Sequence, residues 1–167
     1  GINGPHTLTF DGKNNSKINL TAANTFTEMI VVPTDGNLLP MFAAAAGSLG
    51  GDVTILAAGN GSIAAKLTIN ATDAMSDSAT LSLSGTTATL LTINFADTIR
   101  TLLINGVTQE VGTYGRVGNG AVDFEVSWIA GNGILTVTGA PTTYWDIDGI
   151  TAGAGGGATP AGTWDFS

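Results

Sequence analysis

Two carboxylates on one candidate strand have the types and the spacing of a glycosidase pair. Asp123 and Glu125 lie two residues apart in the segment 122–128, where polar and apolar side chains alternate. Residues i and i+2 of a strand point to the same face, about 7 Å apart. A glycosidase needs two carboxyl groups at a comparable distance, one of them with a raised pKa. The same spacing arises on any strand with a polar face, and no aromatic cleft surrounds this pair, so we predict no catalytic role for it.

Other acid–base or nucleophilic chemistry has few candidates. His6 is the only histidine of the chain, so a Ser-His-Asp triad would have to use it. It follows Pro5, and no nucleophile-elbow pattern occurs in the sequence. The absence of cysteine excludes a cysteine nucleophile, a thiolate zinc site and a disulfide scaffold. We therefore predict a protein that is not an enzyme.

A short acidic motif resembles the start of a calcium-binding loop. It consists of Asp146-Ile147-Asp148-Gly149. An EF-hand loop needs an acidic residue at its twelfth position, where this chain has Gly157. Asp73 and Asp77 form a second, sparser acidic cluster. We predict no cofactor, and we keep a surface calcium site at Asp146 and Asp148 as the alternative.

Four Asn-x-Ser/Thr sequons offer candidate glycosylation sites. They begin at Asn14, Asn19, Asn60 and Asn70. In a chain rich in Asn, Ser and Thr, some sequons arise by chance, so the modification itself needs a mass measurement.

A Trp-Asp pair with an aromatic neighbour, called the aromatic-Trp-Asp pattern below, occurs twice near the end of the chain. Residues 144–147 read Tyr-Trp-Asp-Ile and residues 163–166 read Thr-Trp-Asp-Phe. The linker between them is rich in Gly and Ala and contains Gly153, Gly155, Gly156 and Gly157. Burying one Trp removes about 150–250 Å² of mostly apolar surface from water, so two Trp outside the main body predict docking. The predicted self-association residues are Tyr144, Trp145, Asp146, Ile147, Trp164 and Phe166. The alternative is a sugar-stacking platform formed by the tail aromatics together with Trp128.

Composition limits the class of partner. Charged residues make up 11% of the 167 residues, against about 25% in ordinary globular domains. The net charge is −8 with five Lys plus Arg, which argues against nucleic acid and against an anionic membrane surface. The longest apolar run, residues 38–49, is broken by Pro40 and Gly47. It is too short to cross a bilayer, so we predict no membrane insertion.

Short alternating segments between turn residues predict an all-β protein. The turn dipeptides are Asp-Gly or Asn-Gly pairs, which supply the positive φ that tight β-turns need; they begin at Asp11, Asp35, Asn60, Asn105, Asn119 and Asn132. The candidate strands are His6–Phe10, Lys17–Thr21, Phe26–Val32, Asp52–Ala57, Ile63–Asn70, Ala79–Ser84, Thr86–Asn94, Ile99–Asn105, Val122–Trp128 and Gly133–Thr138.

Two architectures fit these strands. Short strands, high Gly and Thr content and few charges favour a β-solenoid, in which coils stack and polar ladders follow the faces. The lack of a fixed short period favours a two-sheet β-sandwich or jelly roll. The Ala-rich run after Met41 predicts one short helix near residues 38–47, ended by Gly47. We expect an all-β body over residues 1–140 and a docking tail over residues 141–167.

The second half of the chain resembles a known family. Residues 104–115, INGVTQEVGTYG, are followed by residues 128–137, WIAGNGILTV. Together they resemble the end of a unit in bacterial extracellular proteins with autotransporter-associated β-strand repeats. Residues 144–165 resemble the opening of the next unit, and residues 8–12, LTFDG, are a weaker match. The resemblance covers roughly residues 100–167. It implies secretion, surface exposure, a solenoid-like fold and a structural or adhesive role, with no shared catalytic residues.

These observations lead to a structural function. We expect an extracellular or cell-surface protein whose tail docks on another copy, head to tail, to build a filament or array. The alternatives are a surface adhesin or a carbohydrate-binding module, with cell-surface polysaccharide as the partner. A polysaccharide-active enzyme is the third alternative, and the shortage of basic residues disfavours a β-elimination lyase.

Overall fold

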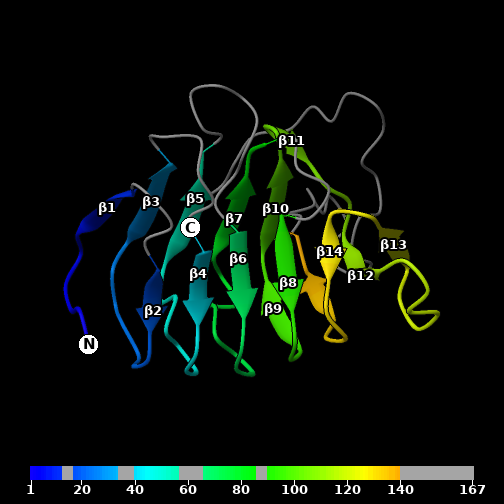
Figure 1. The fold of residues 1–167 in the computed structure, drawn as a ribbon, viewed down its shortest axis with the longest axis horizontal. Coiled ribbons are helices and arrows are strands. Elements are labelled where there is room, and N and C mark those ends of the chain that lie inside the picture. The colour runs from blue at the N-terminus through cyan, green and yellow to red at the C-terminus, as the bar shows by residue number, and fades with distance from the viewer. Residues whose placement is uncertain (13–16, 34–39, 57–65, 86–89, 140–167) are drawn as a thin grey trace, which may run out of the picture.

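The described part of the chain is a β-solenoid in the computed structural model (Figure 1). The structure describes residues 1–12, 17–33, 40–56, 66–85 and 90–139. Within these ranges every regular element is a strand and none is a helix. The predicted all-β solenoid is therefore confirmed, and the sandwich is not the architecture of this chain.

Parallel strands from successive coils stack into two long sheets. Sheet 1 consists, in spatial order, of β1 (Thr7–Gly12), β3 (Glu28–Pro33), β5 (Asp52–Ile55), β7 (Thr80–Leu83), β10 (Thr101–Ile104) and β11 (Val107–Thr108). Sheet 2 consists of β2 (Ile18–Leu20), β4 (Pro40–Ala43), β6 (Lys66–Ile69), β8 (Leu91–Ile93) and β14 (Ile129–Ala130). All neighbours in these sheets are parallel except β10 and β11.

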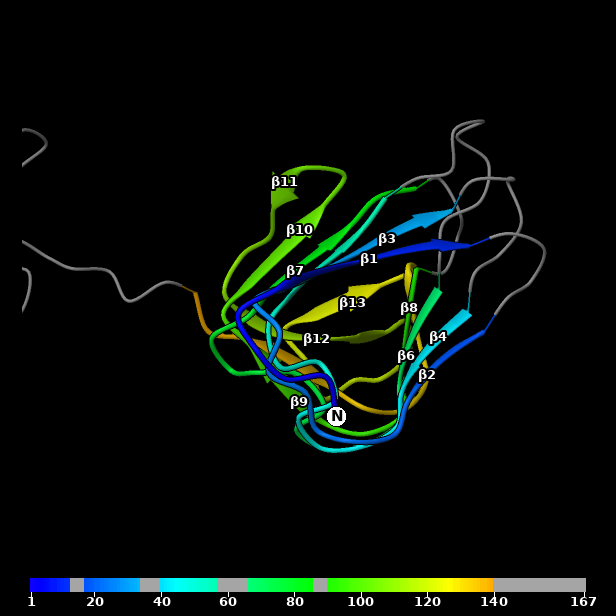
Figure 2. The same cartoon turned by 90° about the vertical axis from the view of Figure 1, so that its left-hand side faces the viewer.

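A third, shorter sheet lies on the remaining side of the coil. Its spatial order is β13 (Phe124–Val126), β12 (Gly112–Arg116), β15 (Leu135–Val137) and β9 (Asp97–Ile99). Figure 2 looks along the stack from the N-terminal end and shows the sheets surrounding one interior. The earlier coils cross this third side as corners joined by the isolated bridges Asn3–Thr25 and Leu49–Met75.

Columns of apolar side chains fill the interior. In sheet 1 the columns are Leu8, Met29, Val53, Leu81, Leu102 and Phe10, Val31, Ile55, Leu83, Ile104. In sheet 2 they are Ile18, Met41, Leu67, Leu91, Ile129 and Leu20, Ala43, Ile69, Ile93. The members on the inner coils are fully buried. Each burial of this kind stabilises the fold by about 1.5–3 kcal/mol for a large side chain, so the columns are the core.

The candidate strands agree with the fold, and each overlaps an observed strand. The polar–apolar alternation over residues 122–128 is confirmed as alternating exposed and partly buried side chains. Asn105 and Gly106 both have positive φ, 51° and 78°, in the turn that joins β10 to β11, as the Asn-Gly pair predicted.

The predicted short helix near residues 38–47 is wrong where the structure describes it. Residues 40–43 form β4, and Met41 and Ala43 are both fully buried in the columns of sheet 2. Gly47 has a φ of 65° and lies at a corner of the coil. Alanine favours helices only weakly, and packing against the neighbouring coils overrides that preference. Residues 38 and 39 lie outside the described part.

Candidate functional site

The N-terminal end of the solenoid is an uncovered sheet edge. β1 and β2 are the outermost strands of sheets 1 and 2, and no strand in the described ranges pairs with their outer sides. Successive residues of a strand direct their N–H and C=O groups to alternate sides. The Leu20 carbonyl accepts from Ala44 N–H at 2.9 Å, so the backbone groups of Asn19 point outward. The His6 carbonyl accepts from Thr27 N–H at 3.1 Å, so by the same alternation the backbone groups of Thr7 and Thr9 point to the open side of β1.

The apolar columns also end there, with no cover from any residue that the structure describes. Leu8, Phe10 and Ile18 are only partly buried. Met29 and Met41, which follow Leu8 and Ile18 in the columns, are fully buried. The difference has one cause, because the first coil has a neighbour on one side only. An additional coil would therefore complete both the hydrogen bonding and the packing.

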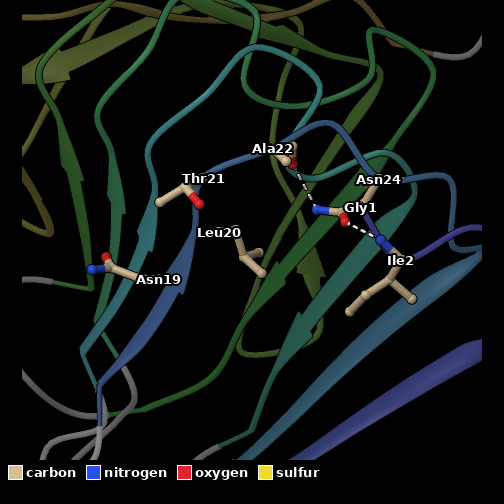
Figure 3. A pocket seen from close by; sticks show the side chains of 7 residues that line it. All are labelled: Gly1, Ile2, Asn19, Leu20, Thr21, Ala22 and Asn24. Atoms are coloured by element: carbon tan, nitrogen blue, oxygen red, sulfur yellow. Dashed lines mark hydrogen bonds between the residues drawn. The ribbon is translucent and has the colours of Figure 1, made fainter.

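A cavity of about 330 Å³ opens at the same end of the molecule (Figure 3). It is lined by Gly1, Ile2, residues 19–22 and Asn24. Figure 3 shows the Asn24 amide hydrogen-bonded to Ile2 and Ala22, with Leu20 between this group and Asn19. Ile2 keeps 40% of its surface exposed, so the cavity has an apolar wall in contact with solvent.

Asn24 holds three coils of the third side together. Its Oδ1 accepts from the Ile2 N–H at 2.6 Å, and its Nδ2 donates to the carbonyls of Ala22 at 2.9 Å and Ser48 at 2.8 Å. Only 7% of the residue is exposed, and its side-chain amide makes hydrogen bonds with backbone groups in place of water. It fixes the position of the N-terminal residues at the open end.

Asp97 has a related role at the other end of this side. Its Oδ2 accepts from Met75 N–H at 3.1 Å and its Oδ1 from Thr98 N–H at 2.9 Å, with 3% of the residue exposed. Burial raises the pKa of this carboxyl to about 6, the charge of Asp73 raises it further, and the Met75 and Thr98 N–H groups lower it. Sequence reasoning missed both Asn24 and Asp97. The available signal was a short polar residue at a corner between two candidate strands.

At the C-terminal end of the body sheet 1 is covered, whereas β14 is the outermost described strand of sheet 2. β11 turns back antiparallel against β10, and Gln109 N–H donates to the Leu102 carbonyl at 2.8 Å. Tyr114 is 3% exposed. Its ring stacks on the Phe124 ring, with 4.7 Å between the ring centroids, and its centroid lies 6.0 Å from that of the Trp128 ring. Trp128 packs against the core, which favours its interpretation as a core residue over a sugar platform.

The carboxylates of the candidate glycosidase pair act as turn acceptors. Asp123 Oδ2 accepts from the N–H and the hydroxyl of Thr113 at 2.8 and 2.7 Å. Glu125 accepts from the N–H groups of Gly118 and Gly120 at 2.9 and 2.6 Å. These hydrogen bonds lower the pKa of both carboxyls. A glycosidase acid needs a raised pKa, so the pair lacks the electrostatics of that chemistry.

The other candidates from the sequence are dispersed. His6 is exposed near β1, while Asp73 and Asp77 belong to no group of three or more metal-ligand residues within the described ranges. Asn19 and Asn70 are exposed, and Asn70 Oδ1 accepts from Asn94 Nδ2 at 2.7 Å.

Several predicted residues lie outside the described ranges. They are the sequon residues Asn14 and Asn60, the docking residues Tyr144, Trp145, Asp146, Ile147, Trp164 and Phe166, the linker glycines Gly153, Gly155, Gly156 and Gly157, and the calcium candidate Asp148. The boundary between body and tail at residues 140 and 141 also lies outside them and stays a prediction.

Comparison with protein-family models, curated proteins and solved structures gives no match. The resemblance to autotransporter-associated repeats therefore stays a prediction. Among the described residues, no helix is long and apolar enough to span a membrane.

Proposed function

We propose that this chain is an extracellular structural protein that associates with copies of itself, head to tail through its C-terminal segment, into a filament or array. The observation that carries the proposal is the uncovered N-terminal end, where the outer edges of β1 and β2 lie beside the half-buried Leu8, Phe10 and Ile18. A sheet edge of this kind is a template for another strand.

The two ends of the body differ, which supports a polar assembly. Strands β1 and β2 offer open parallel edges at one end. At the other end β11 covers β10 in sheet 1, and β14 is the outermost described strand of sheet 2. Both ends carry exposed apolar side chains, Ile2 at 40% on one side and Val107 at 63% and Val111 at 62% around β11. A contact between unlike ends is heterologous and does not close, so it propagates.

The tail has the apolar groups that such a contact needs. Burying one Trp contributes about 4–6 kcal/mol at 25 cal/mol per Å². Association costs about 4–15 kcal/mol in lost translational and rotational freedom. One Trp barely offsets that cost, whereas two, with the backbone hydrogen bonds of a β-edge, exceed most of this range. The repeated aromatic-Trp-Asp pattern is therefore the natural occupant of the open end.

Deletion of residues 141–167 tests the role of the tail. We expect the full chain to form polymers in negative-stain images and light scattering. The shortened chain should stay monomeric with an unchanged far-ultraviolet circular dichroism spectrum of the body. Polymers that persist after the deletion would contradict the proposal.

A substitution at the receiving edge tests the other partner of the contact. Thr9→Pro removes an N–H that points to the open side, and proline is tolerated on edge strands. We expect a folded body that no longer polymerises. Thr54→Pro is the matched control, since β5 lies between β3 and β7 and proline there removes a ladder hydrogen bond and destabilises the body itself. If folded Thr9→Pro protein forms the same polymers as the wild type, β1 is not the receiving edge.

A further inference from the structure

We infer that the two aromatic-Trp-Asp elements of one copy form a single additional coil on the N-terminal end of the next copy, with residues 144–147 parallel to β1 and residues 163–166 parallel to β2. This inference rests on the proposed function and specifies its geometry. It assigns a different receiving strand to each element.

The alternation of the tail matches the composition of one coil. Every inner coil contributes two inward apolar residues to sheet 1 and two to sheet 2, such as Val53 and Ile55 with Leu67 and Ile69. Trp145 and Ile147 alternate with polar or amphipathic neighbours in the first element. Trp164 and Phe166 alternate with Thr163 and Asp165 in the second. The tail thus carries the four inward positions that a further coil requires.

The connections between the sheets decide which element takes which strand. The connections from sheet 1 to sheet 2 vary in length, from Gly12–Ile18 to Ile55–Lys66. The return connections cross the third side as corners with backbone bonds between coils, such as Asn24 N–H to the Gly47 carbonyl at 2.9 Å. Segment 148–162 is long and rich in Gly and Ala. It therefore fits the connection from sheet 1 to sheet 2, where the connections of the body also vary in length. The first element therefore belongs on sheet 1 and the second on sheet 2.

The register follows from the columns. Trp145 and Ile147 would continue the columns that end at Leu8 and Phe10. Trp164 and Phe166 would continue those that end at Ile18 and Leu20.

The polar residues between these apolar pairs also meet suitable partners. Asp146 would lie beside Thr9, and Asp165 beside Asn19, and both receiving residues are exposed. A hydroxyl and an amide can donate to these carboxylates. No carboxylate of the tail would then face the apolar interior.

The length of the chain makes this coil intermolecular. The Gly139 N–H donates to the Arg100 carbonyl at 2.7 Å. Gly139 therefore lies one strand spacing beyond the coil that contains β10. The outer side of β1 lies about six strand spacings away, roughly 29 Å. The chain from Gly139 to Trp145 spans at most about 20 Å when fully extended. The first element therefore cannot reach its own β1, but it can reach the β1 of a copy stacked on its C-terminal end.

Cysteine cross-linking tests the register, because the chain has no cysteine of its own. Paired Cα atoms of adjacent strands lie within the range that a disulfide bridges. Thr9→Cys protein is mixed with Asp146→Cys protein, and Asn19→Cys protein with Asp165→Cys protein. The swapped mixtures, Thr9→Cys with Asp165→Cys and Asn19→Cys with Asp146→Cys, are the matched controls. Each variant is first checked for wild-type polymerisation under reducing conditions.

We expect cross-linked dimers at least about tenfold faster in the matched mixtures than in the swapped ones, since only the matched residues are held at bonding distance. Equal rates in both sets, or faster swapped pairs, would overturn the assignment while polymerisation still upheld the proposed function. A Thr9→Cys/Asp146→Cys double variant that cross-links within one chain would overturn the intermolecular coil. The absence of polymers from the wild-type chain would instead contradict the proposed function itself.

Discussion

The buried carboxyl of Asp97 predicts a stability that falls as the pH rises. Its pKa is raised from 3.8 to about 6 in the folded protein. Below pH 3.8 the group is protonated in both the folded and the unfolded states and carries no penalty. Between 3.8 and 6 the folded state binds more protons than the unfolded state, so the free energy of unfolding decreases with pH. The total decrease is at most about 3 kcal/mol, from 1.36 kcal/mol per pKa unit.

The substitution Asp97→Asn isolates this contribution. Asparagine cannot ionise, and it keeps one oxygen for the two N–H donors, Met75 and Thr98. The variant therefore loses part of the hydrogen bonding at every pH but escapes the cost of a buried charge. We expect the free energy of unfolding of the variant, relative to the wild type, to rise by up to about 3 kcal/mol between pH 3 and pH 7.

The measurement is urea unfolding followed by far-ultraviolet circular dichroism at a series of pH values. Asp123→Asn is the matched control, because Thr113 lowers the pKa of Asp123. Its contribution to stability is present at neutral pH and disappears as the pH falls, which is the opposite sign. A difference between wild type and Asp97→Asn that stays constant from pH 3 to pH 7 would refute the burial argument.

Three further substitutions test the corner that supports the open end. Asn24→Ala leaves the Ile2 N–H and the Ala22 and Ser48 carbonyls without their side-chain partner, and we expect urea unfolding to show a loss of about 2–4 kcal/mol. Asn3→Ala, which gives up one exposed contact of 3.4 Å, should change stability by less than about 0.5 kcal/mol. Equal losses in the two variants would contradict the role of Asn24 in holding the coils together. Ser48→Ala removes a buried hydroxyl without a partner in the described ranges. It should raise the melting temperature or leave it unchanged, and a loss above about 1 kcal/mol would show that the hydroxyl is satisfied.

The sequence predicts the strands of this fold better than it predicts their arrangement. Alternation identifies β7 and β13 directly, because the side chains on one face of each strand are more buried than those on the other. The alanine run at residues 43–46 favours a helix, but its first residue belongs to β4. Only the neighbouring columns require an extended chain there, and they belong to distant segments. The coils also differ in length, so no fixed period distinguishes a solenoid from a sandwich.

The open end is a property that no local pattern encodes. Leu8 on an edge strand and Leu81 on an inner strand have the same type of sequence environment, alternating with polar residues. Which of them lacks a neighbour depends on the order in which coils stack. The proposed docking tail, in contrast, is conspicuous in the sequence because two Trp follow the last candidate strand. The sequence therefore indicates one side of the proposed contact, and the fold is needed to identify the other.

The unprotected state of the N-terminal edge is itself an argument for a specific partner. Proteins usually protect long sheet edges with lysine, proline, bulges or a covering segment. β1 and β2 contain neither lysine nor proline, and Asp11 is their one charged residue. At the other end, the chain reverses direction at Asn105 and covers β10 with β11. Sheet 2 ends there at β14, which has no further neighbour among the described strands, so the asymmetry between the two ends lies in sheet 1. This asymmetry supports the single polarity that we propose. An occupant with four alternating apolar residues then satisfies the open edge more completely than unspecific pairing of two β1 strands, which would leave the columns of sheet 2 uncovered.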